Sequence, residues 1–111
     1  FVQGLGWLTT EELVFDAEGR LRTHAPSTYK IPVASDVPAD LRVSLWQEAN
    51  REDAIHRSKA VGEPPVMLAI SVFSAIADAV HSLSPGKPVS LRAPATPEAI
   101  LDACDAQKGL A

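Results

Sequence analysis

The stretch from Pro64 to about Leu83 constrains the fold more than any other part of this 111-residue chain. Two prolines open it, and proline at the first helical position loses no intrahelical hydrogen bond. The apolar residues that come after them cover most of a helix circumference: Val66, Met67, Leu68, Ile70, Val72, Phe73, Ile76, Val80 and Leu83. A helix of this kind is either buried or crosses a membrane. The pattern therefore predicts one long helix from about Pro64 to Leu83.

Burial suits this helix better than a membrane does. The apolar run before Asp78 is shorter than the ~20 residues that a comfortable crossing needs. A chain of 111 residues can hardly surround such a helix by itself. We therefore expect the helix to be buried inside a larger protein. We also expect the isolated chain to self-associate, because it would expose the apolar surface that the larger protein covers.

The other elements predict an α+β fold. Apolar residues at helical spacing allow a first helix from Phe1 through about Glu12, in spite of Gly4 and Gly6. Each glycine lowers the stability of a helix by about 1 kcal/mol relative to alanine. A segment that passes very close to the helix would explain why glycine stands at positions 4 and 6. Two short runs of apolar and polar residues lie on either side of a glycine-containing turn at residues 16–19. This pattern predicts a β-hairpin over residues 13–23.

Further along, three prolines make residues 25–38 an extended loop. Alternation from Leu41 to Trp46 predicts a further strand, and residues 89–91 a short one. Thr96 as N-cap, Pro97 at the first helical position and Glu98 in the first turn predict a short C-terminal helix. Its expected apolar face carries Ile100, Leu101 and Cys104.

Composition excludes several classes of partner. The formal net charge is −4 and no run of lysine and arginine occurs, so nucleic acid and acidic membrane surfaces are not expected partners. Cys104 is the only cysteine, so no intrachain disulfide can form, which weakly favours a cytoplasmic location. The sequence begins at Phe1, inside an apolar stretch. We interpret residues 1–111 as a single domain whose N-terminal part is missing.

Metal and thiol chemistry have little support in the sequence. His24, His56 and His81 lie far apart, without the spacing of zinc ligands, so surface or half-buried histidines are expected and no metal site. Cys104 lies on the expected apolar face of the last helix, where a buried, inert thiol is the favoured interpretation.

Glu63 is the one candidate catalytic residue. It stands between Gly62 and Pro64, on the loop that enters the long helix. The prolines stiffen the chain after it and would hold a carboxylate in place, as a general base requires. By pattern alone, an acid that merely favours the helix dipole is the more common explanation. The residues leave both interpretations open.

Four stretches, taken together, resemble the xanthine dehydrogenase and xanthine oxidase family over essentially the whole chain. The most specific runs from Ser58 to Pro65 and contains Gly62-Glu63-Pro64-Pro65. Three other stretches resemble the family's sequence and occur in the same order along the chain: residues 1–6, residues 26–32, and residues 94–98 with Ala103-Cys104. His24-Ala25 before Pro26 departs from the family pattern, where a glycine is expected. Ala60-Val61 and the proline pair favour the xanthine branch over the aldehyde branch.

The resemblance implies that the chain is the C-terminal part of the molybdenum-binding domain of a molybdenum hydroxylase. In that family the glutamate that corresponds to Glu63 is the general base that activates a hydroxide on molybdenum, which then attacks a purine such as hypoxanthine or xanthine. Molybdenum–molybdopterin would be held by upstream residues, with iron–sulfur clusters and FAD elsewhere in the parent. Cofactor-binding residues of this chain stay unassigned, and the isolated chain is expected to bind no molybdenum and to be inactive.

The expected partners are the remainder of the subunit, the iron–sulfur and flavin modules, and a purine. Two alternatives stay open. One is a related molybdenum hydroxylase that acts on an aldehyde or another N-heterocycle. The other is a non-enzymatic interaction module that uses the proline-rich loop or the apolar helix to bind a partner.

Overall fold

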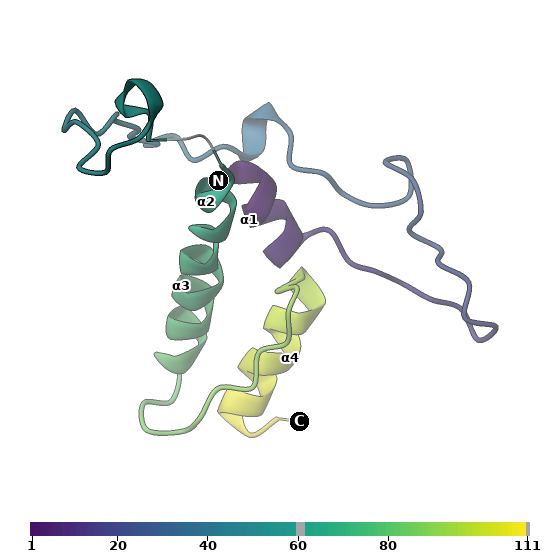
Figure 1. The fold of residues 1–111 in the computed structure, drawn as a ribbon. Helices are drawn as coiled ribbons and strands as arrows, with labels where there is room; N and C mark the ends of the chain where they lie inside the picture. The colour runs from purple at the N-terminus through teal and green to yellow at the C-terminus, as the bar shows by residue number, and fades with distance from the viewer. Residues whose placement is uncertain (60–61, 111) are drawn as a thin grey trace.

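Helices account for the regular structure of the chain. The computed structural model describes residues 1–59 and 62–110. Within them the chain forms four α-helices: α1 (Val2–Thr9), α2 (Pro64–Met67), α3 (Ile70–His81) and α4 (Pro97–Lys108). Helix α1 contacts α2 and α3, and α3 contacts α4 (Figure 1). Two single turns of 3₁₀ helix, Ala34–Asp36 and Ile55–Arg57, lie in the long connection between α1 and α2.

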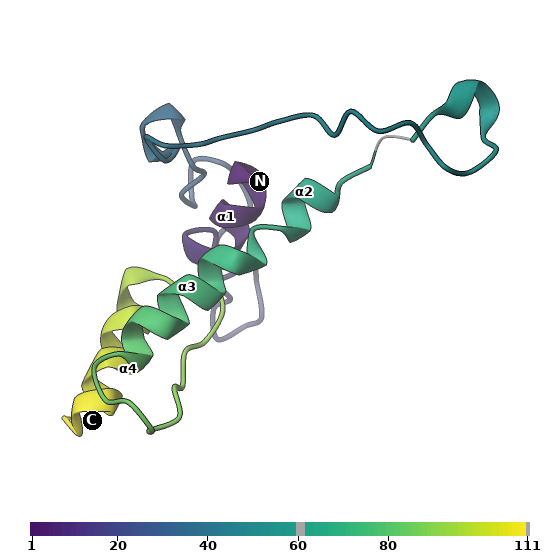
Figure 2. The same cartoon turned by 90° about the vertical axis from the view of Figure 1, so that its left-hand side faces the viewer.

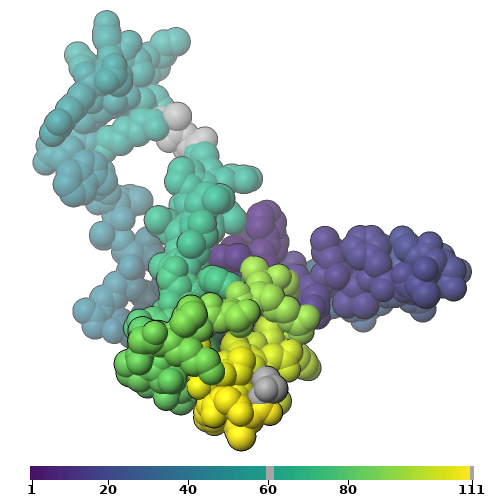
Figure 3. All heavy atoms as spheres, turned by 90° about the horizontal axis from the view of Figure 1, so that it is seen from below, coloured from purple at the N-terminus to yellow at the C-terminus, as the bar shows by residue number. Residues whose placement is uncertain are grey.

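The chain is extended, with a small core. Its radius of gyration is 18.5 Å, whereas a compact domain of this length has about 13 Å. Two arms project from the helices, one early in the chain and one just before α2 (Figure 3). The buried apolar residues in the described part are small, apart from one valine: Ala69, Val80, Ala95, Ala99 and Ala103. Most large apolar side chains therefore lie on the surface.

The predicted α+β fold is wrong for the described residues, which form no strand. In place of a β-hairpin, the first arm holds one isolated antiparallel bridge between Phe15 and Leu21. Residues 41–46 and 89–91 also lack regular structure, and Val43 and Leu45 are each 82% exposed. A lone two-stranded hairpin is marginal in water, and a half-buried strand needs a sheet beside it. The described chain supplies no such sheet.

The long helix is only partly confirmed. It begins at Pro64, as predicted, but its regular part stops after Met67, resumes at Ile70 and ends at His81 (Figure 2). The break is tightened by bonds of 3₁₀ type, in which the Val72 amide donates to the Ala69 oxygen at 2.9 Å. Only 11% of the segment Pro64–His81 is buried in this chain, as expected of a chain too small to surround the helix, and its burial inside a larger protein stays a prediction.

The same segment meets the length and composition of a membrane-crossing helix, with 18 residues and a mean hydropathy of 1.4. One such helix is weak support for a membrane span, because the core helix of a larger protein has the same character. The segment exposes Met67, Leu68 and Ile70, each more than half accessible to solvent.

The predicted start of α4 is confirmed, whereas the predicted apolar face of this helix differs from the face that is buried in the structure. Thr96 Oγ1 accepts a hydrogen bond from the Ala99 amide at 3.2 Å, and Pro97 is the first helical residue. The buried positions are Ala99, Ala103 and Gln107, four residues apart. Leu101 is 60% exposed and Cys104 is only half-buried. Small side chains face inward because α4 packs closely against α3.

Gly4 and Gly6 of α1 lie where neighbouring segments pass very close to the helix. This confirms the prediction that a close neighbour explains two glycines within a helix. A Cβ atom at Gly4 would clash with the Val66 carbonyl oxygen and lie 2.9 Å from the Ala69 Cβ atom. One at Gly6 would lie 2.5 Å from the ring of Pro32. Helix α1 also ends earlier than predicted, at Thr9 rather than Glu12. These contacts place α1 directly against the start of the α2–α3 segment (Figure 2).

Candidate functional site

Glu63 stands at the N-cap position of α2, as the sequence predicted. Its backbone oxygen accepts a hydrogen bond from the Val66 amide at 2.9 Å, and its side chain makes no capping bond. Pro64 and Pro65 come next in the first turn, so the chain after the carboxylate is stiff. Among residues 1–59 and 62–110, the Glu63 carboxylate has no hydrogen-bond or ion-pair partner and is exposed.

The surroundings of Glu63 differ from the shielded entrance that a buried helix implied. Gly62, Pro64 and Pro65 are exposed too, and Val66 is half-buried. Ala60 and Val61, which belong to the signature stretch, lie outside the described residues. The structure therefore fixes the backbone position of Glu63 relative to α2. Its catalytic role stays a prediction.

A closed loop of residues 46–59 precedes Glu63, and sequence patterns did not find it. The Lys59 ammonium group donates to the Trp46 oxygen at 2.9 Å, and the Asn50 side-chain amide donates to the Ser58 oxygen at 2.6 Å. A side-chain bond across eight positions has no periodic signature. The only available hint was asparagine in a polar stretch, a residue that often bonds to the backbone of turns.

Two clefts lie beside the end of α1, away from Glu63. One of about 510 Å³ is lined mainly by Trp7, Leu13, Leu21 and Tyr29, and one of about 470 Å³ reaches Arg92 and Pro94. Both share Trp7, Glu11, Glu12 and Leu13. Glu63 lines neither of these two clefts.

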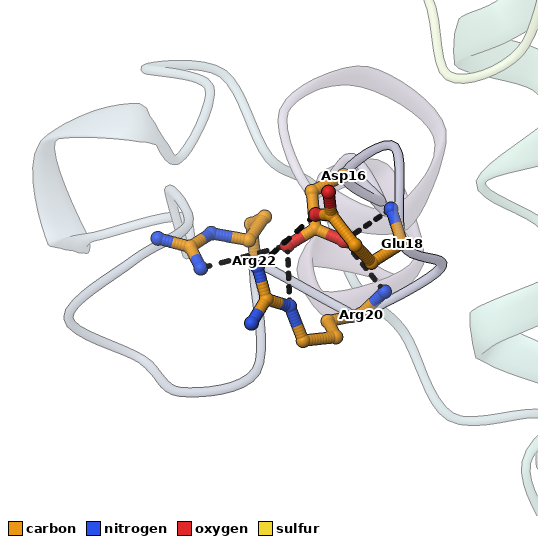
Figure 4. Close-up of polar contacts among 4 residues, drawn as sticks. All are labelled: Asp16, Glu18, Arg20 and Arg22. Atoms are coloured by element: carbon orange, nitrogen blue, oxygen red, sulfur yellow. Dashed lines mark hydrogen bonds and ion pairs between the residues drawn. The ribbon is translucent and has the colours of Figure 1, made fainter.

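A charged cluster closes the tip of the first arm. The Asp16 carboxylate accepts from the Arg20 amide at 2.8 Å and from the Arg20 Nε atom at 2.9 Å, with Glu18 and Arg22 beside it (Figure 4). The bond from the Arg20 backbone holds the pKa of Asp16 below its usual value, although partial desolvation opposes this. These bonds lie within one turn, so the cluster stabilises the arm locally.

The described residues do not supply a metal site. Among residues 1–59 and 62–110, no three His, Cys, Asp or Glu side chains come together in a group that could hold an ion. His24 lines the larger cleft, His56 lies in the closed loop and His81 ends α3.

The chain is similar to known molybdenum enzymes. Residues 1–38 match the family described as the molybdopterin cofactor-binding domain. The chain is 50% identical over 111 residues to a xanthine dehydrogenase/oxidase of Felis catus, covering 94% of the chain and 8% of that protein. It is 47% identical over 115 residues to xanthine dehydrogenase 1 of Arabidopsis thaliana, with the same coverage. An aldehyde oxidase of Homo sapiens is 39% identical over 109 residues, covering 95% of the chain and 8% of that enzyme.

These similarities first define the class: over most of its length the chain is related to xanthine dehydrogenases and aldehyde oxidases. Within this class, the chain belongs to the xanthine dehydrogenase and oxidase family, from its molybdenum-binding region. The resemblance drawn from residues 58–65 and the three other stretches is thereby confirmed. The chain spans only 8% of the length of the curated relatives it matches.

Proposed function

We propose that this chain is part of a molybdenum hydroxylase that oxidises hypoxanthine or xanthine with water-derived oxygen. The observation that carries the proposal is the gradient of identity, which is 50% to the cat xanthine dehydrogenase/oxidase and 39% to the human aldehyde oxidase over nearly the same residues. Such an enzyme would act in purine breakdown in the cytoplasm. An aldehyde or another N-heterocycle is the alternative substrate.

Glu63 is the residue of this chain that we assign to the reaction, as general base. Its carboxylate is exposed and has no partner among the described residues. The proline pair after it limits the directions in which it can point. The molybdenum–molybdopterin cofactor of the parent would supply the oxidising chemistry, with iron–sulfur clusters and FAD elsewhere in the parent. Glu63 would take the proton from the water-derived hydroxyl group that attacks the substrate.

The substrate is tested on the complete enzyme that contains this chain. We expect kcat/KM for xanthine to exceed that for an aromatic aldehyde by at least about tenfold, a difference of ~1.4 kcal/mol in transition-state binding. Both substrates are measured with the same electron acceptor and the same molybdenum content. A preference for the aldehyde would replace the purine proposal by the alternative and leave the role of Glu63 untouched.

The isolated chain is proposed to self-associate and to bind no molybdenum. Exposed Met67, Leu68 and Ile70 form an apolar surface on α2–α3, and such surfaces drive association. Light scattering on a sizing column should give a mass above the 11.8 kDa of one chain. Leu68→Glu should reduce that mass, whereas Ser74→Glu, at an exposed polar position of α3, should not. A monomer at micromolar concentration, or stoichiometric molybdenum in the chain, would contradict the proposal.

A further inference from the structure

The larger of the two clefts beside α1 lies between two segments that are tied to each other. The first arm leaves the end of α1 and returns to it (Figure 1), where the Thr10 hydroxyl group donates to the Lys30 oxygen at 2.9 Å. At the base of the arm, the Arg22 amide donates to the Val14 oxygen at 2.7 Å, and the Val14 amide donates to Thr23 Oγ1 at 3.0 Å. The chain itself therefore sets the shape of this hollow of about 510 Å³.

Apolar and aromatic side chains make up much of the lining of this cleft, namely Trp7, Leu13, Leu21 and Tyr29. Trp7 is 52% and Leu13 is 69% exposed, so a large part of this surface faces solvent. Single exposed apolar side chains are common in proteins, whereas several that gather in one hollow are typical of a contact site. The lining is therefore suited to an apolar segment of polypeptide.

Two carboxylates line the same cleft without partners of their own. Glu11 and Glu12 are both half-buried there. Among residues 1–59 and 62–110, neither side chain forms an ion pair or a hydrogen bond. His24 is the only basic residue that lines this cleft, and Arg92 lines the smaller cleft instead. The larger cleft thus lacks a permanent positive charge to match its two carboxylates, and such a pair favours a cation.

Most of the parent enzyme lies outside this chain, which spans only 8% of the length of the curated relatives it matches. That remainder offers many segments that could fill the cleft. Among cationic side chains, arginine suits the lining better than lysine does. A guanidinium group stacks on aromatic faces and meets carboxylates with paired N–H donors, whereas an ammonium group is a compact, strongly hydrated point charge.

We propose that the larger cleft is the docking site for a segment of the parent enzyme outside this chain, in which apolar residues flank an arginine. The apolar residues pack against Leu13 and Leu21. The guanidinium group pairs with the carboxylates of Glu11 and Glu12, beside the ring of Trp7. The docking depends on the family assignment alone, because neither the substrate nor the general base takes part in it.

The first test measures backbone hydrogen exchange of residues 7–29 in the complete enzyme and in the isolated chain. We expect exchange to be at least about tenfold slower in the complete enzyme, because the docked segment limits local opening. Replacing both acids, Glu11→Gln with Glu12→Gln, removes their charges and keeps the shape of their side chains. In the complete enzyme this double variant should exchange at least about threefold faster than the native protein over the same residues.

Glu48→Gln is the control, because it neutralises an exposed carboxylate of the other arm, and it should leave exchange in residues 7–29 unchanged. Equal exchange in the native enzyme and the isolated chain would overturn the proposal, as would native protection in the double variant. Exchange in the isolated chain that slows as its concentration rises would also overturn it, because a second copy would then be the occupant.

The second test leaves the sequence of the chain unchanged and uses two short peptides as probes. One is acetyl-Leu-Arg-Leu-amide, and the other carries citrulline, which keeps the shape of arginine without its charge. Binding is followed by the NMR signal of the Trp7 indole N–H group in the chain. We expect the arginine peptide to bind with a dissociation constant at least about threefold lower than that of the citrulline peptide. Equal binding of the two peptides, or a shift of the Trp46 signal alone, would overturn the proposal.

Discussion

Replacing Glu63 by glutamine in the complete enzyme is expected to lower kcat by at least about 100-fold, because glutamine keeps the shape of the side chain and cannot accept the proton. A well-placed general base contributes about 10²- to 10⁴-fold. The loss should lie near the upper end of this range if the base also creates the nucleophile. Steady-state turnover of xanthine is the measurement, with molybdenum content determined for every preparation.

Glu48→Gln provides the matched control, because Glu48 is another exposed carboxylate of the preceding loop and has no assigned role. It should retain nearly normal turnover. A fall in molybdenum content in Glu63→Gln would indicate a structural effect and would require comparison at equal content. Normal turnover at full molybdenum loading would remove Glu63 from the reaction.

Gly4→Val is expected to cause the largest loss of stability in the chain, of about 3 kcal/mol. Even the first added carbon would lie 2.9 Å from the Ala69 Cβ atom and closer still to the Val66 carbonyl oxygen. That oxygen belongs to the backbone, so relief requires α1 to move away from α2 and α3. Overpacking typically costs about 1–3 kcal/mol, and valine regains only part of the helix propensity that glycine lacks.

The measurement is urea unfolding of the chain, monitored by its helical circular dichroism. Ser74→Val is the control, because it places the same β-branched residue at an exposed position of α3. It should change the free energy of unfolding by less than about 0.5 kcal/mol. An unchanged or higher midpoint for Gly4→Val would show that α1 does not cross α2–α3 as closely as described.

Sequence predicted those helix features that depend on local chemistry. Thr96 with Pro97 and the proline pair at residues 64–65 define helix starts within a few residues, and no distant partner is needed. The glycines of α1 likewise signalled close contacts, because their cost in a helix needs a compensating reason.

Features that depend on distant partners could not be predicted in the same way. Val43 and Leu45 alternate like a strand, yet alternation only states which face would be buried if a sheet were present. The apolar α2–α3 segment is exposed in this chain, as expected of a chain too small to surround it, and a residue's type does not say which surface would cover it. At the candidate site, the motif identified Glu63, whereas the bond from Asn50 to Ser58 required coordinates.

The most direct test of the central claim, that Glu63 is the base of a purine hydroxylase, is anaerobic mixing of the complete enzyme with xanthine. Reduction of the enzyme by substrate is monitored as loss of visible absorbance, which isolates the chemical step from later electron transfer to the acceptor. We predict rapid loss in the native enzyme and, at equal molybdenum content, a rate at least about 100-fold lower in Glu63→Gln. A Glu63→Gln enzyme that is reduced as fast as the native one would contradict the claim.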